Sequence, residues 1–211
     1  MTIGILALQG DYAAHRAVLE SLGVGRVLDV RTADELAVCD GLVLPGGEST
    51  TMSRLCDRYS LWAPLQQKLA GGMGAFGTCA GLILLAKKIE GATPNFPQKT
   101  LGALDVDVAR NAYGAQADSF ECNLNWEPNI EYSMRDNPGS KRLDFGSQDS
   151  LRAVFIRAPR IVRVGENVET LARHDGEAVA VRFEKIVGCA FHPEIAGENR
   201  LHRLWLRSLS R

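Results

Sequence analysis

The chain has 211 residues, of which 45% are hydrophobic and 23% are charged, which is enough apolar material for one large domain. Its 24 basic and 25 acidic residues give a formal net charge of -1, which argues against nucleic acid or an anionic membrane as the main partner. Five scattered cysteines without a C-x-x-C pair argue against a disulfide framework and a structural zinc site. We therefore expect a single domain, residues 1–211, in the cytoplasm with reduced thiols.

The first half of the chain alternates between strand and helix patterns. Residues 3–8 form a short apolar run without the basic start of a signal peptide, which predicts a strand buried on both faces. Further strands are predicted at 27–30, 41–44 and 73–76, and helices at 11–22, 62–70 and 80–86. The capping-box pair Thr32 and Glu35 predicts a brief helix, and a Ser49 cap predicts another that runs through Arg58. This alternation predicts a parallel sheet covered by helices.

The second half of the chain consists mostly of closely spaced strand patterns. They lie at 101–108, 119–124, 153–156, 168–172, 178–183 and 186–191, before a closing helix at 200–209. The polar stretch 127–150 contains Asn137-Pro138-Gly139 and predicts a surface insertion without a function of its own. The expected fold is therefore α/β and three-layered. Its central sheet is mostly parallel, with helices on both faces and antiparallel additions in the second half.

Cys79 stands in the first of three segments that could carry chemistry. The sequence Gly77-Thr78-Cys79-Ala80-Gly81 follows an apolar strand and precedes an apolar helix, which is the cysteine form of the nucleophile elbow. Its glycines permit a tight turn, and the turn places the sulfur at a helix N-terminus that favours the thiolate. A small buried cysteine in a glycine-rich turn is the alternative. The context of strand, elbow and helix favours the nucleophile.

The second segment is Phe191-His192-Pro193-Glu194, directly after an apolar run. Pro193 favours an extended backbone at His192, and in an extended segment residues two apart point the same way. Glu194 can then lie beside the imidazole and fix its tautomer, as the third member of a catalytic triad does. A histidine at a strand end beside a surface glutamate is the alternative interpretation.

The third segment, residues 44–50 (LPGGEST), follows a strand and opens a helix. Bare N–H groups of Gly46 and Gly47, together with the N–H of Ala80, could stabilise an oxyanion. The segment lacks the lysine of a phosphate-binding P-loop and the spacing of a dinucleotide site, so a plain turn is the main alternative.

Together the three segments predict the hydrolysis of an amide. A thiolate attacks the carbonyl, backbone donors hold the oxyanion, and the imidazolium protonates the departing ammonia. Water activated by His192 then releases the acid. This chemistry uses no metal and no cofactor.

The same residues resemble the class I glutamine amidotransferase family and, within it, the glutaminase subunits of pyridoxal 5′-phosphate synthases. The shared segments cover most of the chain from its start to Glu194: IGILALQGD (3–11), GLVLPGGESTTMSRL (41–55), FGTCAGLILLAK (76–87), RNAYGAQADSFE (110–121), VFIRAP (154–159) and GCAFHPE (188–194). GTCAG and HPE belong to the wider class, whereas LALQGD, LPGGESTT and FIRAP narrow the match.

The resemblance implies a flavodoxin-like fold of the class I glutaminase type and a triad of Cys79, His192 and Glu194. It implies hydrolysis of L-glutamine to glutamate and ammonia. The ammonia passes to a synthase subunit, a TIM barrel in that family, which makes pyridoxal 5′-phosphate within a large hetero-oligomer. It also implies that glutaminase activity is low until the synthase docks, near Gln9-Gly10. The residues implied to contact glutamine are Gly47, Glu48, Ser49, Arg110, Ile156 and Arg157.

Two features depart from the family pattern, and two other functions stay open. The family often has arginine where this chain has Ala115, and residues 127–150 form a longer insertion than in many members. The first open alternative is a glutaminase of the same class in another biosynthetic pathway. The second is a flavodoxin-like regulatory module that has lost the chemistry. The LALQGD and FIRAP segments weigh against the first alternative, and the intact triad of Cys79, His192 and Glu194 weighs against the second.

Overall fold

The computed structural model describes residues 1–91, 98–110, 119–127 and 150–210. Its larger sheet has the strand order β2-β1-β3-β4-β12-β11-β10-β7-β8. The first five strands run parallel to one another: β2 (Arg26–Val30), β1 (Thr2–Leu6), β3 (Gly41–Leu44), β4 (Gly74–Thr78) and β12 (Ile186–Cys189). The remaining strands are antiparallel to their neighbours: β11 (Glu177–Phe183), β10 (Glu169–His174), β7 (Phe120–Trp126) and β8 (Ser150–Phe155). The predicted parallel sheet with antiparallel additions is confirmed.

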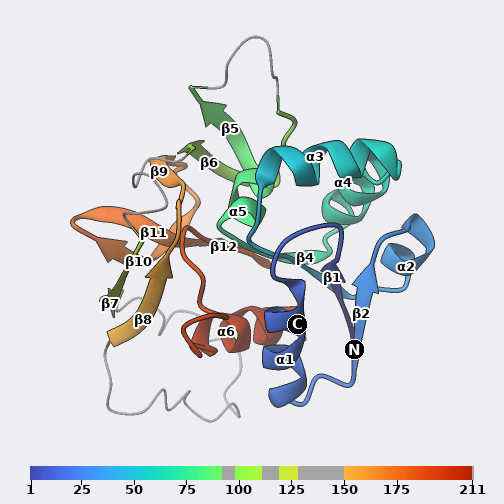
Figure 1. Ribbon diagram of the computed structural model, residues 1–211, viewed down its shortest axis with the longest axis horizontal. Helices are drawn as coiled ribbons and strands as arrows, with labels where there is room; N and C mark the ends of the chain where they lie inside the picture. Colours follow the sequence, from blue (N-terminus) through green and yellow to red (C-terminus); the bar gives the residue numbers. More distant parts are fainter. Residues whose placement is uncertain (92–97, 111–118, 128–149, 211) are drawn as a thin grey trace.

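Helices cover both faces of the parallel strands (Figure 1). Helices α1 (Tyr12–Ser21) and α6 (Arg200–Leu209) lie on one face, and α3 (Ser49–Arg58), α4 (Trp62–Ala70) and α5 (Ala80–Leu85) lie toward the other. Successive residues of β4 point to opposite faces of the sheet, and each face of this strand meets one of the two helix layers. A Cβ at Gly74 would meet Leu209 of α6, whereas a Cβ at Gly77 would meet Gly81 and Leu85 of α5. The three-layer arrangement is therefore as predicted.

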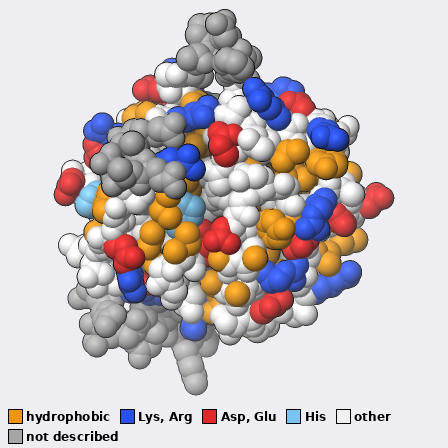
Figure 2. Space-filling model, in the orientation of Figure 1, with side chains coloured by type: hydrophobic (Ala, Val, Ile, Leu, Met, Phe, Trp, Pro, Cys, Tyr) orange, Lys and Arg blue, Asp and Glu red, His pale blue; other side chains and the backbone are white. Residues whose placement is uncertain are grey.

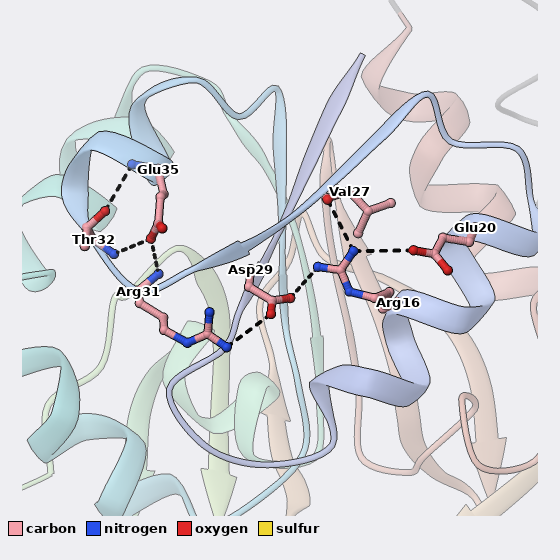
Figure 3. Close-up of polar contacts among 7 residues, drawn as sticks. All are labelled: Arg16, Glu20, Val27, Asp29, Arg31, Thr32 and Glu35. Carbon is pink, nitrogen blue, oxygen red and sulfur yellow. Dashed lines mark hydrogen bonds and ion pairs between the residues drawn. The ribbon is translucent and has the colours of Figure 1, made fainter.

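Charged side chains join the first helix to the second strand. Arg16 of α1 donates to the Val27 carbonyl at 3.3 Å and to the Asp29 carboxylate at 2.5 Å (Figure 3). Asp29 also accepts from Arg31 at 3.1 Å, and Glu20 lies 3.4 Å from Arg16 one helical turn away. These contacts fix α1 against the edge strand β2, although exposed pairs of this kind each contribute little to stability.

The capping box predicted at Thr32 and Glu35 is present at the start of α2 (Ala33–Ala37). The Glu35 N–H donates to the Thr32 hydroxyl, and the Glu35 carboxylate accepts from the Thr32 N–H (Figure 3). The cap of α3 differs from the prediction. Ser49 is the first residue of that helix, and the side chain of Glu48 accepts from its free N–H groups.

A second sheet of three strands, β5-β6-β9, was not predicted as a separate unit. Its strands are β5 (Ala86–Glu90), β6 (Leu104–Ala109) and β9 (Arg160–Val164). The strand predicted at 101–108 corresponds to β6, which is not part of the larger sheet. It pairs in parallel with β5 and antiparallel with β9. The helix predicted to reach Ala86 ends at Leu85, where the backbone turns directly into β5.

On the face seen in Figure 2, acidic, basic and hydrophobic side chains are interspersed, in agreement with the balanced composition. Among the residues that the structure describes, no helix is long and apolar enough to cross a membrane. Most of the predicted insertion at 127–150, and the departure at Ala115, lie outside the described residues.

Candidate active site

Cys79 occupies a strained turn between β4 and α5. Its backbone has φ 48° and ψ -101°, a conformation that non-glycine residues rarely adopt and that is typical of functional sites. The glycines around it are required by packing. A Cβ at Gly81 would lie 1.9 Å from the Leu44 carbonyl oxygen, and a Cβ at Gly77 would lie 2.6 Å from the backbone of Gly81. The chain can make this turn only with glycine on both sides of the cysteine.

His192 and Glu194 lie just beyond the end of β12. The backbone N–H of His192 donates to the Val154 carbonyl at 2.9 Å, which fixes the segment against β8. The imidazole Nδ1 lies 2.8 Å from Oε1 of Glu194, and the two residues are 6% and 7% exposed. With Nδ1 donating to the carboxylate, Nε2 is the nitrogen left to exchange a proton with a reacting group.

The same imidazole contacts Cys79. Burial lowers the pKa of His192, but hydrogen bonds and charge from Cys79 and Glu194 outweigh burial and raise that pKa to about 10. The Sγ of Cys79 lies 4.0 Å from the Ile156 carbonyl, and Cys79 is only 5% exposed. The structure therefore brings together the sulfur, the imidazole and the carboxylate, which are separated by up to 115 positions, from 79 to 194.

Replacing Glu194 by glutamine is expected to lower the pKa of His192 from about 10 toward its ordinary value of 6.5. The amide keeps the shape of the side chain but removes the negative charge that favours the imidazolium, while burial still disfavours it. Titration of the histidine Cε1 signals by NMR measures this pKa. The matched control is Glu166→Gln, which changes an exposed carboxylate. A value that stays near 10 in Glu194→Gln would contradict the prediction.

The Gly46–Gly47 loop packs against the imidazole and against the loop that follows β1. A Cβ at Gly46 would lie 2.2 Å from Cε1 of His192. The Gly46 carbonyl accepts from the Asp11 N–H at 3.2 Å, and the Gln9 side-chain oxygen accepts from the Glu48 N–H at 2.8 Å. Gly10 must be glycine here, because its φ is 95° and a Cβ would meet the Gly46 carbonyl oxygen at 1.9 Å. The oxyanion roles of Gly46, Gly47 and Ala80 stay predictions.

The predicted substrate residue Glu48 has a structural use as well. Its carboxylate accepts from the N–H groups of Thr50 and Thr51 at 3.2 and 2.6 Å, so it caps α3. Burial raises the pKa of Glu48, but these hydrogen bonds outweigh it and lower that pKa. Arg110 lies 3.5 Å from the same carboxylate, and the buried Ser49 donates to Gln98 at 3.2 Å. Glu48 and Arg110 are therefore neighbours, and their contact with glutamine stays a prediction.

The predicted pair Ile156-Arg157 follows β8 beside the sulfur of Cys79. The Ile156 carbonyl lies 4.0 Å from Sγ, and Arg157 is exposed with φ 46°. This second strained backbone position lies at the same end of the sheet as the elbow, and the contact with glutamine stays a prediction.

Three residues around Glu194 were not predicted as part of a site. His15 of α1, Thr78 of β4 and His202 of α6 are each 0% exposed and linked by hydrogen-bonding distances behind the carboxylate. In the sequence His15 and His202 fit the patterns of their helices. No spacing signal connects positions 63 and 187 residues apart.

A hollow of about 440 Å³ lies elsewhere, against β9, β10 and β11. Three arginines line it, but each pairs with an acidic residue: Arg160 with Glu177, Arg163 with Asp105 and Asp107, and Arg173 with Glu127. None of the predicted site residues lines it, so we place the candidate site at Cys79.

The strand order 2-1-3-4 followed by β12 is that of a flavodoxin-like sheet, whose ligands bind beyond the carboxyl ends of the strands. Cys79, the Gly46–Gly47 loop and His192 all follow the carboxyl ends of parallel strands. The fold and the site define a flavodoxin-like α/β protein with a cysteine, histidine and carboxylate at the functional edge. The family profile described as the SNO glutamine amidotransferase family matches residues 5–211, and the chain belongs to that family.

Curated relatives and solved structures agree with this assignment. The pyridoxal 5′-phosphate synthase subunit PdxT of Acidothermus cellulolyticus is 46% identical over 97% of this chain and 91% of its own length. The protein of the same name from Thermosipho africanus is 42% identical over the whole of both chains. A crystal structure of a glutamine amidotransferase has a TM-score of 0.82 at 38% identity, covering 99% of each chain. The chain is thus an enzyme of the glutamine amidotransferase class.

Proposed function

We propose that this chain hydrolyses L-glutamine to L-glutamate and ammonia, with Cys79 as the nucleophile, His192 as the general base and acid, and Glu194 as the group that orients His192. The observation that carries the proposal is the buried contact of His192 with both Cys79 and Glu194 at the strained elbow. The adjacent carboxylate favours an imidazolium despite burial, and an imidazolium favours a thiolate partner.

The proposed reaction begins with attack of the Cys79 thiolate on the side-chain amide of glutamine. The N–H groups of Gly46, Gly47 and Ala80 then hold the oxyanion. Attack consumes the negative charge on sulfur, which is one of the causes that raise the pKa of His192. The imidazolium therefore becomes acidic enough to protonate the departing ammonia. Neutral His192 next activates water, which cleaves the thioester and returns the enzyme to its first state.

We further propose contacts for the substrate. Arg110 binds the α-carboxylate of glutamine, because a guanidinium matches a carboxylate in geometry and charge. Glu48, its neighbour at 3.5 Å, then faces the α-amino group. The backbone of Ile156 and Arg157, beside the sulfur, lines the rest of the pocket with Gly47 and Ser49.

The ammonia is proposed to pass to a separate synthase subunit that makes pyridoxal 5′-phosphate. Two observations support this partner: the relatives at 42% and 46% identity are named as synthase subunits, and the segments LALQGD and FIRAP narrow the resemblance to them. We propose that residues 1–211 form one glutaminase domain in the cytoplasm, and that the partner is a TIM barrel in a hetero-oligomer. The 5% exposure of Cys79 supports low activity before docking.

The proposal is tested with the synthase subunit encoded in the same genome. Glutamate release from glutamine is measured with and without that subunit, and pyridoxal 5′-phosphate formation is measured with glutamine or with ammonium chloride as nitrogen source. We expect glutamine to support formation only when this chain is present, and ammonium chloride to support it without this chain. Glutamate without product from glutamine would indicate another pathway. No glutamate under any condition would indicate a regulatory module.

A further inference from the structure

A buried line of polar groups extends behind Glu194 into the layer between the sheet and helices α1 and α6. His15 Nε2 lies 3.5 Å from Oε2 of Glu194 and 3.1 Å from the Thr78 hydroxyl. His15 Nδ1 lies 3.0 Å from Nε2 of His202. The side chains of His15 and Glu194 are 0% exposed, and so are residues Thr78 and His202. Burying polar groups in an apolar layer is costly unless they are paired, so this line requires an explanation.

The layer around the two histidines is aromatic. Phe76 makes edge contacts with both imidazoles, with ring centroids 6.2 Å from His15 and 4.8 Å from His202, and Trp205 packs beside it at 6.0 Å. Apolar side chains of similar size would fill this space without any polar group. The presence of two imidazoles instead indicates that they act on a polar neighbour, and the polar neighbour at the end of the line is Glu194.

The two oxygens of Glu194 have different partners. Oε1 is 2.8 Å from His192, whereas the buried Oε2 has no hydrogen-bond partner in the described part of the chain and lies 3.5 Å from His15 Nε2. A carboxylate held through one oxygen can rotate about its last bond. Contact at both oxygens fixes the plane of the carboxylate, and hence the direction in which Oε1 accepts from His192.

Both buried histidines are neutral, so each has one donor nitrogen. Burial, followed by the charges of His202 and His192, lowers the pKa of His15, and burial lowers that of His202 to about 3. If His202 donates from Nε2 to His15 Nδ1, then His15 carries its proton on Nε2 and donates toward Thr78 and Glu194. The opposite tautomers would direct a lone pair at the carboxylate and leave a buried N–H at His202 Nδ1, which has no hydrogen-bond partner among the described residues.

We propose that His15 is a positioning residue of the glutaminase site, which donates from Nε2 to the outer oxygen of Glu194 in a tautomer fixed by His202. The inference rests on the proposed function of Cys79, His192 and Glu194. His15 does not touch the substrate. It keeps the carboxylate oriented while His192 gains and loses its proton.

The titratable groups that face Glu194 are His192 on its own segment, His15 from α1 with His202 behind it, and the Cys189 thiol at the end of β12. Burial, followed by the charges of Glu194 and Cys79, raises the pKa of Cys189. The Cys189 thiol therefore stays neutral and places no charge beside Glu194. His15 is therefore the neutral donor that faces the outer oxygen of Glu194, and its loss would leave that buried oxygen without a donor.

The experiment measures glutamate release by the complex with the synthase subunit, as kcat and KM for glutamine across pH, for three substitutions of His15. His15→Leu is expected to lower kcat by about tenfold, the loss expected when a buried charged acceptor loses its donor, with KM little changed. The acid side of the pH profile is expected to move upward by about one unit. His15→Gln, whose amide nitrogen can replace Nε2, is expected to restore most of kcat, and His15→Asn, whose amide nitrogen replaces Nδ1, is not.

One control variant separates positioning from simple destabilisation, and a second variant tests the role of His202. Leu19→Ala removes a buried side chain one turn along α1 and is expected to lower the thermal midpoint without moving the pH profile. His202→Leu is expected to lower kcat in the same direction as His15→Leu. If His15→Leu does not fold, the comparison of His15→Gln with His15→Asn decides. An equal loss of kcat in these two variants would overturn the proposal.

The outcomes distinguish this inference from the proposed function. If Cys79→Ala retains glutaminase activity, the proposed nucleophile is wrong and the role of His15 falls with it. If Cys79→Ala is inactive while His15→Leu matches the unaltered chain in kcat and pH profile, only the role of His15 is overturned. A tenfold loss of kcat in His15→Leu that is restored in His15→Gln but not in His15→Asn supports both the proposed function and the role of His15.

Discussion

Replacing Cys79 by alanine is expected to reduce glutamate release by the complex with the synthase by at least about 10⁴-fold, because the covalent step has no other nucleophile. The substitution removes only the sulfur and leaves a methyl side chain, so the elbow backbone can keep its turn. Circular dichroism and the thermal midpoint check that the fold is retained. Assembly with the synthase is checked by size-exclusion chromatography.

A matched control comes from Cys56→Ala. Cys56 is 0% exposed within α3, and burial, with a smaller effect of Asp57, raises the pKa of its thiol to about 12, so it is unreactive at neutral pH. Its loss is expected to leave kcat near that of the unaltered chain. A glutamine analogue with an electrophilic side chain should label the peptide that contains Cys79 and no other cysteine peptide. Activity that survives in Cys79→Ala, or labelling at another cysteine, would refute the assignment.

Local patterns were sufficient for most of the parallel half of the fold. The bounds predicted for 41–44, 62–70 and 200–209 coincide with β3, α4 and α6. Each of these segments has a clear local boundary, such as Pro45-Gly46 after β3 or Gly71 after α4. The buried strands β3 and β4 also read as continuous apolar or small-residue runs, as expected for strands covered on both faces.

The smaller sheet shows where local patterns fail. β5 follows α5 without a turn residue, because the backbone of Ala86 changes from helical to extended at ψ 155°. Its sequence AKKIE has few strand-forming residues, and its pairing with β6 depends on contact with residues about 20 positions away. β9 pairs with β6 across more than 50 positions. Such pairings are decided by the packed sheet and not by the segment's own sequence.

The candidate site divides in the same way. Cys79 and the pair His192 and Glu194 are indicated by motifs within a few residues, since the elbow and the extended His-Pro-Glu segment each fix their own geometry. The contact of His15 with Glu194 links a helix near the start of the chain with a loop near its end, 179 positions apart (194 − 15). A histidine on a buried helix face gives no local indication of which residue it will meet.

Replacing Gly46 by alanine is expected to lower kcat by about 100-fold or more, because the new methyl group would occupy the place of the His192 ring. A Cβ at this position lies 2.2 Å from Cε1 and 2.8 Å from Nδ1 of His192, far inside van der Waals contact. The backbone of His192 is held by its 2.9 Å hydrogen bond to the Val154 carbonyl, so the ring must rotate. Rotation breaks the 2.8 Å contact with Glu194.

The pKa of His192 provides an independent readout of that displacement. In Gly46→Ala this pKa is expected to fall from about 10 toward 6.5, because burial persists while the contacts that favour the imidazolium are lost. The matched control is Gly25→Ala, whose Cβ would meet only the Met1 carbonyl oxygen, at an ordinary 3.7 Å. It is expected to change neither kcat nor the pKa. Full activity in Gly46→Ala would show that the loop can retreat from the imidazole, and that its tight packing is not needed to hold His192 between Cys79 and Glu194.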